Sequence, residues 1–166
     1  VPLPQVLYNV PGRTSVNMLP ETVARLAELS EMVAIKEASG NLGQMAEIIN
    51  LAGDKITLLS GDDNITLPAL AIGGKGVISV VANIVPKDTS DLVRLWEEGK
   101  IQEARALFYK LFPLCQAMFL ETNPIPVKTS VALMGMSQYE MRLPMCAMAP
   151  SNLEKLKKAL GAYGLI

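Results

Sequence analysis

A lysine at the end of an apolar run is the residue of this chain best suited to covalent chemistry. Lys36 follows the apolar run Val33–Ile35, and Gly40 interrupts the pattern soon afterwards. Such a run predicts a strand buried on both faces, and burial favours the neutral form of a lysine. A neutral amine attacks a carbonyl to give an imine, which then acts as an electron sink for carbanion chemistry. The alternative is a lysine that reaches solvent and pairs with the neighbouring Glu37.

A tyrosine and an arginine follow a second short apolar run. They lie in the segment Tyr8–Arg13, which reads Tyr-Asn-Val-Pro-Gly-Arg. In a parallel barrel the reactive groups gather at the carboxyl ends of the strands, so Tyr8 and Lys36 are expected to share one pocket. Tyr8 is suited to relaying a proton, and Arg13 to holding a carboxylate through its bidentate fork. The alternatives are a tyrosine that packs in the core and an arginine that is a solvated loop charge.

Two glycine-containing segments also fall at predicted strand boundaries. Gly61–Asp63 is either a metal or substrate site, or a tight turn whose aspartate caps the next helix. Gly73–Gly76 lacks the spacing of a phosphate-binding loop, because no serine or threonine follows Lys75. We therefore expect a turn in which one backbone segment approaches another closely.

The elements that must position these residues alternate regularly. Apolar runs predict strands over residues 5–9, 33–36, 56–60 and 76–80. Helical patterns follow each of them, beginning at Pro20, at a capping Asn41, before Leu67 and at Pro86. This alternation is typical of right-handed βα units in a parallel sheet.

The pattern changes to helix alone after Gly99. Helical spacing covers residues 101–120 and 126–134, and Ser151–Glu154 reads as a capping box that opens a last helix. We therefore expect two regions, residues 1–99 with βα units and residues 100–166 with helices packed on them. Because four parallel strands leave two costly edges, and the chain begins at Val1 rather than methionine, we interpret the βα region as half of an eight-unit barrel.

Composition narrows the class of partner. The chain has 166 residues, of which half are apolar and 19% are charged, and this is enough for one soluble globular unit. Fifteen basic residues against 16 acidic ones leave no basic face for nucleic acid, which favours a small metabolite as the partner. No leader and no apolar run of membrane-spanning length is found, so a cytoplasmic location without a membrane is expected.

The histidine and cysteine content limits the chemistry further. The absence of histidine excludes Ser-His-Asp and Cys-His catalysis and every zinc site that needs histidine. Cys115 and Cys146 lie far apart in no ligand spacing, and we expect both to be reduced thiols. Catalysis is left to lysine, tyrosine, arginine or carboxylates, with no metal.

Six segments, taken in order, resemble the pyruvate-dependent class I aldolase family. They cover nearly the whole chain and are Tyr8–Thr14, Val33–Asn41, Leu58–Asp63, Gly73–Val80, Asn123–Lys128 and Arg142–Met145. The fold that this resemblance implies is α/β, the carboxyl-terminal half of a (β/α)8 TIM barrel (strands 5 to 8) followed by a helical carboxyl-terminal region. It also implies a cytoplasmic homotetramer, a dimer of dimers.

The resemblance assigns a role to each candidate residue. It implies that Lys36 forms a Schiff base with pyruvate and that the enamine then attacks the aldehyde of aspartate semialdehyde, in lysine and diaminopimelate biosynthesis. Tyr8 matches the family's proton-relay tyrosine, and Arg13 the residue that holds the semialdehyde carboxylate. Gly61 and Ile78 fall where the family shapes its pyruvate pocket. No metal and no organic cofactor is implied.

Two alternatives remain open. Arg13 favours the synthase branch, because the sialic acid lyase branch tends not to carry an arginine here, but a sialic acid lyase or another sugar-acid aldolase is still compatible. The match begins at the fifth barrel strand, and the family's Gly-Thr-Thr-Gly-Glu pyruvate loop has no counterpart in this sequence. The second alternative is therefore a non-catalytic half-barrel that pairs its open edges.

Overall fold

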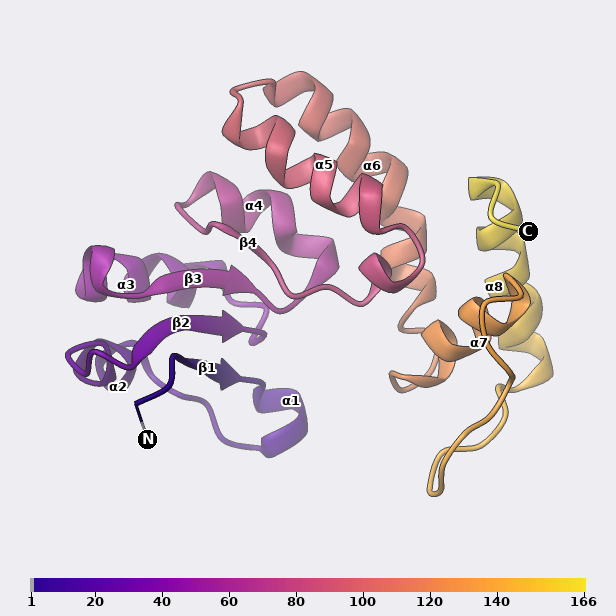
Figure 1. Cartoon of the computed structure of the whole chain (residues 1–166), viewed down its shortest axis with the longest axis horizontal. Helices are drawn as coiled ribbons and strands as arrows, with labels where there is room; N and C mark the ends of the chain where they lie inside the picture. Colours follow the sequence, from indigo (N-terminus) through magenta and orange to yellow (C-terminus); the bar gives the residue numbers. More distant parts are fainter. Residues whose placement is uncertain (1) are drawn as a thin grey trace. The chain divides into compact units, whose positions relative to one another are not determined.

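Four short parallel strands form one sheet in the first part of the chain, as the computed structural model in Figure 1 shows. The structure describes residues 2–166. The strands pair in the order β1-β2-β3-β4, and their bounds are β1 (Gln5–Asn9), β2 (Met32–Glu37), β3 (Thr57–Ser60) and β4 (Gly76–Val77). Every neighbouring pair is parallel, which confirms the predicted α/β class.

The fourth strand is shorter than the apolar run that predicted it. Its ladder with β3 ends one residue after Val77, where the Ile78 amide donates to the Ser60 carbonyl at 2.9 Å. Ser60 is the last residue of β3, and β4 itself ends at Val77. The prediction of a strand as far as Val80 was therefore wrong.

Helices separate the strands, as parallel connections require. They are α1 (Pro11–Thr14), α2 (Pro20–Leu26), α3 (Leu42–Ala52) and α4 (Thr66–Ala71), with 3-10 turns η1 (Gly53–Lys55) and η2 (Asp63–Ile65). The predicted cap of α3 is confirmed, because the Asn41 side chain accepts from the Gln44 amide at 3.1 Å. The predicted aspartate cap is wrong, since α4 begins after Ile65 without a side-chain cap.

The predicted close backbone approach at the glycine-rich turn is confirmed at Gly74. A Cβ atom added there would lie 2.7 Å from the Ala69 carbonyl oxygen in α4. Only glycine therefore lets the chain turn from α4 into β4 along this path.

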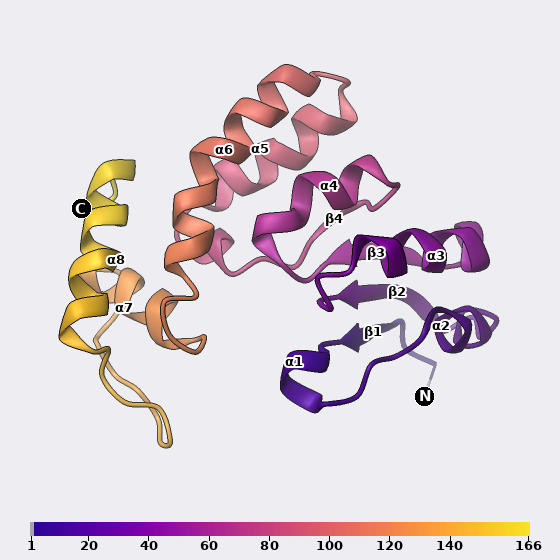
Figure 2. The same cartoon turned by 180° about the vertical axis from the view of Figure 1, so that it is seen from behind.

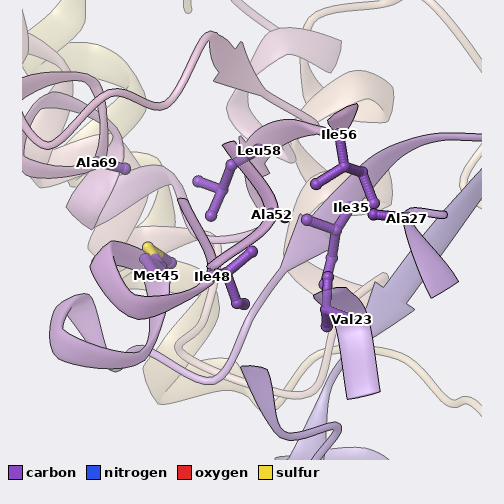
Figure 3. Packing of buried hydrophobic residues seen from close by; sticks show 9 residues of the cluster. All are labelled: Val23, Ala27, Ile35, Met45, Ile48, Ala52, Ile56, Leu58 and Ala69. Atoms are coloured by element: carbon purple, nitrogen blue, oxygen red, sulfur yellow. The ribbon is translucent and has the colours of Figure 1, made fainter. Parts of the chain in front are cut away.

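The helices cover one face of the sheet and form the core with it (Figure 3). Ile35 of β2 and Leu58 of β3 point toward these helices and are almost fully buried. They pack with side chains of α2 and the residue after it, of α3, of the segment before β3 and of α4, namely Val23, Ala27, Met45, Ile48, Ala52, Ile56 and Ala69. Since strand residues alternate between faces, Lys36 must lie on the other face of the sheet.

The second part of the chain is helical, as predicted after Gly99. Its elements are η3 (Val81–Asn83), α5 (Pro86–Glu97), α6 (Ile101–Ala117), α7 (Ile125–Leu133) and α8 (Pro150–Tyr163). Helix α5 packs along α6, and α8 contacts both α6 and α7; the view from behind in Figure 2 shows α5 and α6 side by side again. No helix within residues 2–166 is long and apolar enough to cross a membrane.

The last helix begins differently from the prediction. It starts at Pro150, and Ser151 lies inside it rather than at a capping box. The Glu121 carboxylate instead accepts from the Ala149 amide at 2.9 Å and from the Asn152 side chain at 3.0 Å. The capping box was wrong because proline already occupies the first helical position and a distant carboxylate takes the donors.

The chain divides into two compact units, and the boundary falls between Ser79 and Val80. The predicted limit near Gly99 marks where the βα pattern of the sequence ends, and the domain ranges 1–99 and 100–166 stay a prediction.

Candidate active site

Lys36 and Tyr8 lie side by side on neighbouring strands. The parallel register of β1 and β2 pairs their Cα positions, and the Lys36 Nζ atom lies 4.3 Å from the centroid of the Tyr8 ring. At this distance the ammonium is attracted to the face of the ring. Lys36 is half-buried, whereas Tyr8 is 48% exposed. The prediction that Tyr8 and Lys36 meet is therefore confirmed, while their sharing of one pocket stays a prediction.

The other predicted site residues lie just beyond the carboxyl ends of the strands. Arg13 is on α1, directly after β1, and Figure 1 shows α1 beyond the tip of the β1 arrow. Gly61 follows β3 and Ile78 follows β4. All five residues therefore lie at or just beyond the carboxyl ends of the strands of one sheet, where Lys36 contacts Tyr8.

The Arg13 side chain is free to take a ligand. It is exposed, and within the described residues 2–166 it makes no side-chain hydrogen bond or ion pair. Its backbone is ordered by α1, where the Arg13 amide donates to the Val10 carbonyl at 2.9 Å. The helix therefore presents an unpaired guanidinium at the edge that carries Lys36.

Gly61 is pressed against the turn that follows Lys36. A Cβ atom added to Gly61 would lie 2.5 Å from the Ala38 Cβ atom, closer than real side chains approach. The Gly61 amide also donates to the Glu37 carbonyl at 2.7 Å. The absence of a side chain at Gly61 therefore lets the end of β3 approach the turn after β2, next to Lys36.

Glu37 is not the ion-pair partner of Lys36, and that alternative was wrong. The Glu37 side chain is fully buried on the helix-covered face, opposite to Lys36. Its carboxylate accepts hydrogen bonds from Asn9 Nδ2 at 2.8 Å, Gln44 Nε2 at 3.1 Å and the Ser39 amide at 2.6 Å. Within the described part of the chain, Lys36 forms no ion pair.

We call Asn9, Asn17, Glu37 and Gln44 the carboxamide network. Besides its bond to Glu37, Asn9 Nδ2 donates to Asn17 Oδ1 at 2.8 Å, and Asn17 Nδ2 donates to Gln44 Oε1 at 2.7 Å. The network thus joins the last residues of β1 and β2 to α3 and to the loop after α1. Sequence reasoning missed it, although adjacent strand residues must face opposite ways, so Glu37 could not share the face of Lys36.

The charges at this edge influence one another. Burial raises the pKa of the Asp62 carboxyl, the carboxylates of Asp63 and Glu37 raise it further, and the positive charge of Lys36 opposes them. Asp62 follows Gly61 and therefore lies at the same edge. Within residues 2–166 no cluster of three or more His, Cys, Asp or Glu side chains is suited to holding a metal ion.

Comparisons with known proteins point to one family. The sequence profile of the dihydrodipicolinate synthetase family matches residues 1–163. A curated relative, the 4-hydroxy-tetrahydrodipicolinate synthase of Thermodesulfovibrio yellowstonii, is 60% identical over 164 residues, which are 99% of this chain and 56% of that protein. The chain therefore spans about half the length of the curated relative that it matches.

Solved structures agree with this similarity. A crystal structure of dihydrodipicolinate synthase matches all of this chain and 57% of its own chain, with 54% identity and a TM-score of 0.96. A structure described as the first monomeric dihydrodipicolinate synthase variant matches 97% of this chain and 55% of its own, with 42% identity and a TM-score of 0.93. The arrangement of strands and helices is thus that of known synthase structures over the matched half.

Proposed function

This chain belongs to the dihydrodipicolinate synthetase family, and we propose that it carries the imine-forming lysine of a lyase that condenses pyruvate with aspartate semialdehyde in lysine and diaminopimelate biosynthesis. One observation carries the proposal. The Lys36 amine lies against the ring of Tyr8, 4.3 Å from its centroid, at the carboxyl edge of a parallel sheet. Reactive groups gather at this edge in barrels of parallel strands.

The chemistry follows from a lysine beside a phenol. The neutral Lys36 amine attacks the ketone carbon of pyruvate. The resulting hydroxyl is protonated and lost as water, which leaves a protonated imine that joins the nitrogen to that carbon. A base then removes a proton from the pyruvate methyl group, and the resulting enamine attacks the aldehyde carbon of the semialdehyde. The new alkoxide needs a proton, and we assign its relay to the phenol of Tyr8, whose ring lies against the Lys36 amine.

The remaining site residues receive roles by position. Arg13 holds the carboxylate of the semialdehyde through two parallel hydrogen bonds, since its guanidinium is unpaired and exposed. Gly61 and Ile78 shape the pyruvate pocket with backbone and apolar side chain, from the ends of β3 and β4. No step in this scheme uses a metal or an organic cofactor.

The same proposal extends to the whole protein. We assign the four-stranded sheet to strands 5 to 8 of a (β/α)8 barrel. Within residues 2–79, β1 and β4 each pair on one side only, and further strands could close the sheet there. A homotetramer is the proposed assembly, and the monomeric variant among the similar structures makes this a point to measure. A cytoplasmic location fits Cys115 and the exposed Cys146, because neither forms a disulfide within residues 2–166 and a reducing compartment keeps thiols reduced.

Trapping the imine tests the proposal. The protein is incubated with pyruvate, reduced with borohydride and digested, and the modified peptide is found by mass spectrometry. We expect one carboxyethyl adduct, at Lys36, that is lost in K36R and kept in K55R, which changes an exposed lysine paired with Glu28. Absence of the adduct from Lys36, or an even spread over surface lysines, would overturn the proposal.

The choice of aldehyde is tested separately. Arg13 favours a small acceptor with a carboxylate over a sugar, because a carboxylate uses the guanidinium fork fully. The protein is offered aspartate semialdehyde or a sugar aldehyde after the imine has formed, and consumption of the enamine is followed. Faster consumption by the sugar would instead indicate a sugar-acid aldolase.

A further inference from the structure

Glu37 is a buried carboxylate with no positively charged partner. Its side chain has no exposed surface, and within residues 2–166 no lysine or arginine pairs with it. The groups that approach it are all donors: two carboxamides and the Ser39 amide. An ionised carboxylate only accepts, so this set of partners fits the charged form. Burying such a charge is costly unless hydrogen bonds compensate, as they do here.

The carboxylate decides which way the Asn9 amide faces. Asn9 Nδ2 donates to Glu37 and to Asn17, so the Asn9 Oδ1 atom is left as an acceptor. That oxygen accepts the Met18 amide at 2.9 Å. A carboxamide turned the other way would place its NH2 group against the Met18 amide and its oxygen against the carboxylate. Glu37 therefore fixes an amide that a solvated asparagine would leave free to rotate.

Asn9 closes the loop that carries the unpaired arginine. The loop leaves the sheet at Asn9 and returns to the Asn9 side chain at Met18, and α1 with Arg13 lies between these two points. A second attachment near its end joins Asn17 to Gln44 of α3. Because the Arg13 side chain forms no hydrogen bond or ion pair within residues 2–166, the position of its guanidinium depends on how the loop is anchored.

We propose that Glu37 is a positioning residue for the aldehyde substrate, acting through the carboxamide network to hold the Arg13 loop. This inference rests on the proposed function. Lys36 itself lies on the opposite face of the sheet and is held by the β ladder, so formation of the imine does not depend on the network. The network is therefore expected to affect the second substrate and not the first.

The test compares E37Q with E47Q in steady-state kinetics of the full chain. E37Q keeps the shape of the side chain but places an NH2 group against one of three donors, whereas Glu47 is an exposed residue of α3 that undergoes the same change. We expect E37Q to raise the KM for aspartate semialdehyde on the order of tenfold, equivalent to about 1.4 kcal/mol. The KM for pyruvate and the trapping of Lys36 should stay as in E47Q.

Two further variants separate positioning from general loss of structure. N17A removes the second loop attachment at an exposed residue and should raise the same KM in the same direction, even if E37Q folds poorly. In an R13A background, E37Q should add little to the KM for the aldehyde, because the residue that it positions is gone. Additive effects of E37Q and R13A would indicate a merely structural role and overturn the inference.

The outcomes also separate this inference from the proposed function. If pyruvate and borohydride leave the unsubstituted protein unmodified at Lys36, the proposed function fails. If the unsubstituted protein is trapped and active but E37Q and N17A leave the KM for the aldehyde unchanged, only the positioning role is wrong. A fall in imine trapping as large as the rise in the KM for the aldehyde would also count against positioning.

Discussion

At the scale of single residues, the phenol hydroxyl of Tyr8 is the group whose role can be isolated most cleanly. The ring of Tyr8 already has a structural role, because Lys36 Nζ lies over its face. Y8F keeps that ring and removes only the hydroxyl. Since a positioned acid or base contributes on the order of 100-fold or more, we expect condensation to slow by about that factor. Steady-state turnover measures this.

The control for Y8F is Y109F, which changes an exposed tyrosine of α6 in the same way. Y109F should turn over at the unsubstituted rate. Borohydride trapping of pyruvate should still modify Lys36 in Y8F, because the lysine keeps its place in the register with β1. Full turnover in Y8F would remove Tyr8 from the proton relay.

Gly61 offers a second prediction at this scale, because its missing side chain is what the fold uses. G61A brings a methyl group to 2.5 Å from the Ala38 Cβ atom, and Ala38 is held by the Asn9 carbonyl at 2.8 Å. We expect a loss of roughly 1–3 kcal/mol in the free energy of unfolding, the usual cost of overpacking. Urea denaturation of G61A and G12A measures it, since nothing lies within 4 Å of a Cβ atom at Gly12. Equal stability of the two variants would contradict the crowding.

At the scale of elements, the sequence predicted local structure better than the contacts that join elements. The strands, the α3 cap at Asn41 and the meeting of Tyr8 with Lys36 follow from patterns within a few residues and from the parallel register. The carboxamide network joins Asn9, Asn17 and Gln44 through three-dimensional packing, and no local pattern marks such a set. Glu37 was misread for a different reason, because neighbouring strand residues face opposite sides of the sheet and Glu37 therefore cannot share the face of Lys36.

The start of α8 gives an element-scale prediction in which sequence pattern and structure disagree. The pattern makes Ser151 the capping residue, whereas the Glu121 carboxylate receives the Ala149 amide and the Asn152 side chain. We expect E121A to lose about 1 kcal/mol of stability, typical of a lost helix cap, and S151A to lose much less. Thermal unfolding of both variants decides between the two caps. A larger loss of stability in S151A than in E121A would instead support Ser151 as the capping residue.

Hydrogen bonds that join α5, α6 and α8 predict that the stability of the protein depends on pH. Hydrogen bonds from Lys110 and then from Tyr163 hold the pKa of the Asp88 carboxyl below its usual range. A lowered carboxyl pKa adds stability above the pKa of the unfolded chain, and this stability is lost as the pH falls through the folded value. Burial, with the bond to Asp88, raises the pKa of Tyr163, so the phenol stays protonated at neutral pH.

Y163F should therefore be less stable than the unsubstituted protein at neutral pH, by about 1 kcal/mol. The gap should narrow in acid, once Asp88 is protonated in both proteins, because the bond lost in the variant is then weaker. Urea denaturation at acid and at neutral pH measures this difference in stability. Y139F is not a suitable control, because the Tyr139 hydroxyl accepts a hydrogen bond from the Met148 amide. Y109F serves instead, at an exposed position. A gap independent of pH would show that the carboxylate does not govern these hydrogen bonds.

At the scale of the whole molecule, every proposed site residue lies before Ser79 and belongs to one sheet edge. The chain nevertheless spans 56% of the length of the curated relative, so the site residues found here need not be all that the reaction uses. The sequence could predict the βα order because each unit repeats a local pattern. It could not predict what lies along the outer side of β1 or β4, since pairing of an edge strand depends on a partner and not on a local pattern.

The open side of β1 supplies the last prediction. An edge strand offers unpaired amides and carbonyls, and β1 also presents the apolar side chain of Val6, which is 49% exposed. We expect the chain to associate through this edge, with a sedimentation coefficient that rises with protein concentration. A lysine on an edge strand disfavours such pairing, so V6K should shift the equilibrium toward monomer. V16K makes the same change at an exposed loop position outside the sheet and should leave association unchanged. A chain that stays monomeric at all concentrations, and melts in one cooperative transition, would show that this edge of β1 does not drive association.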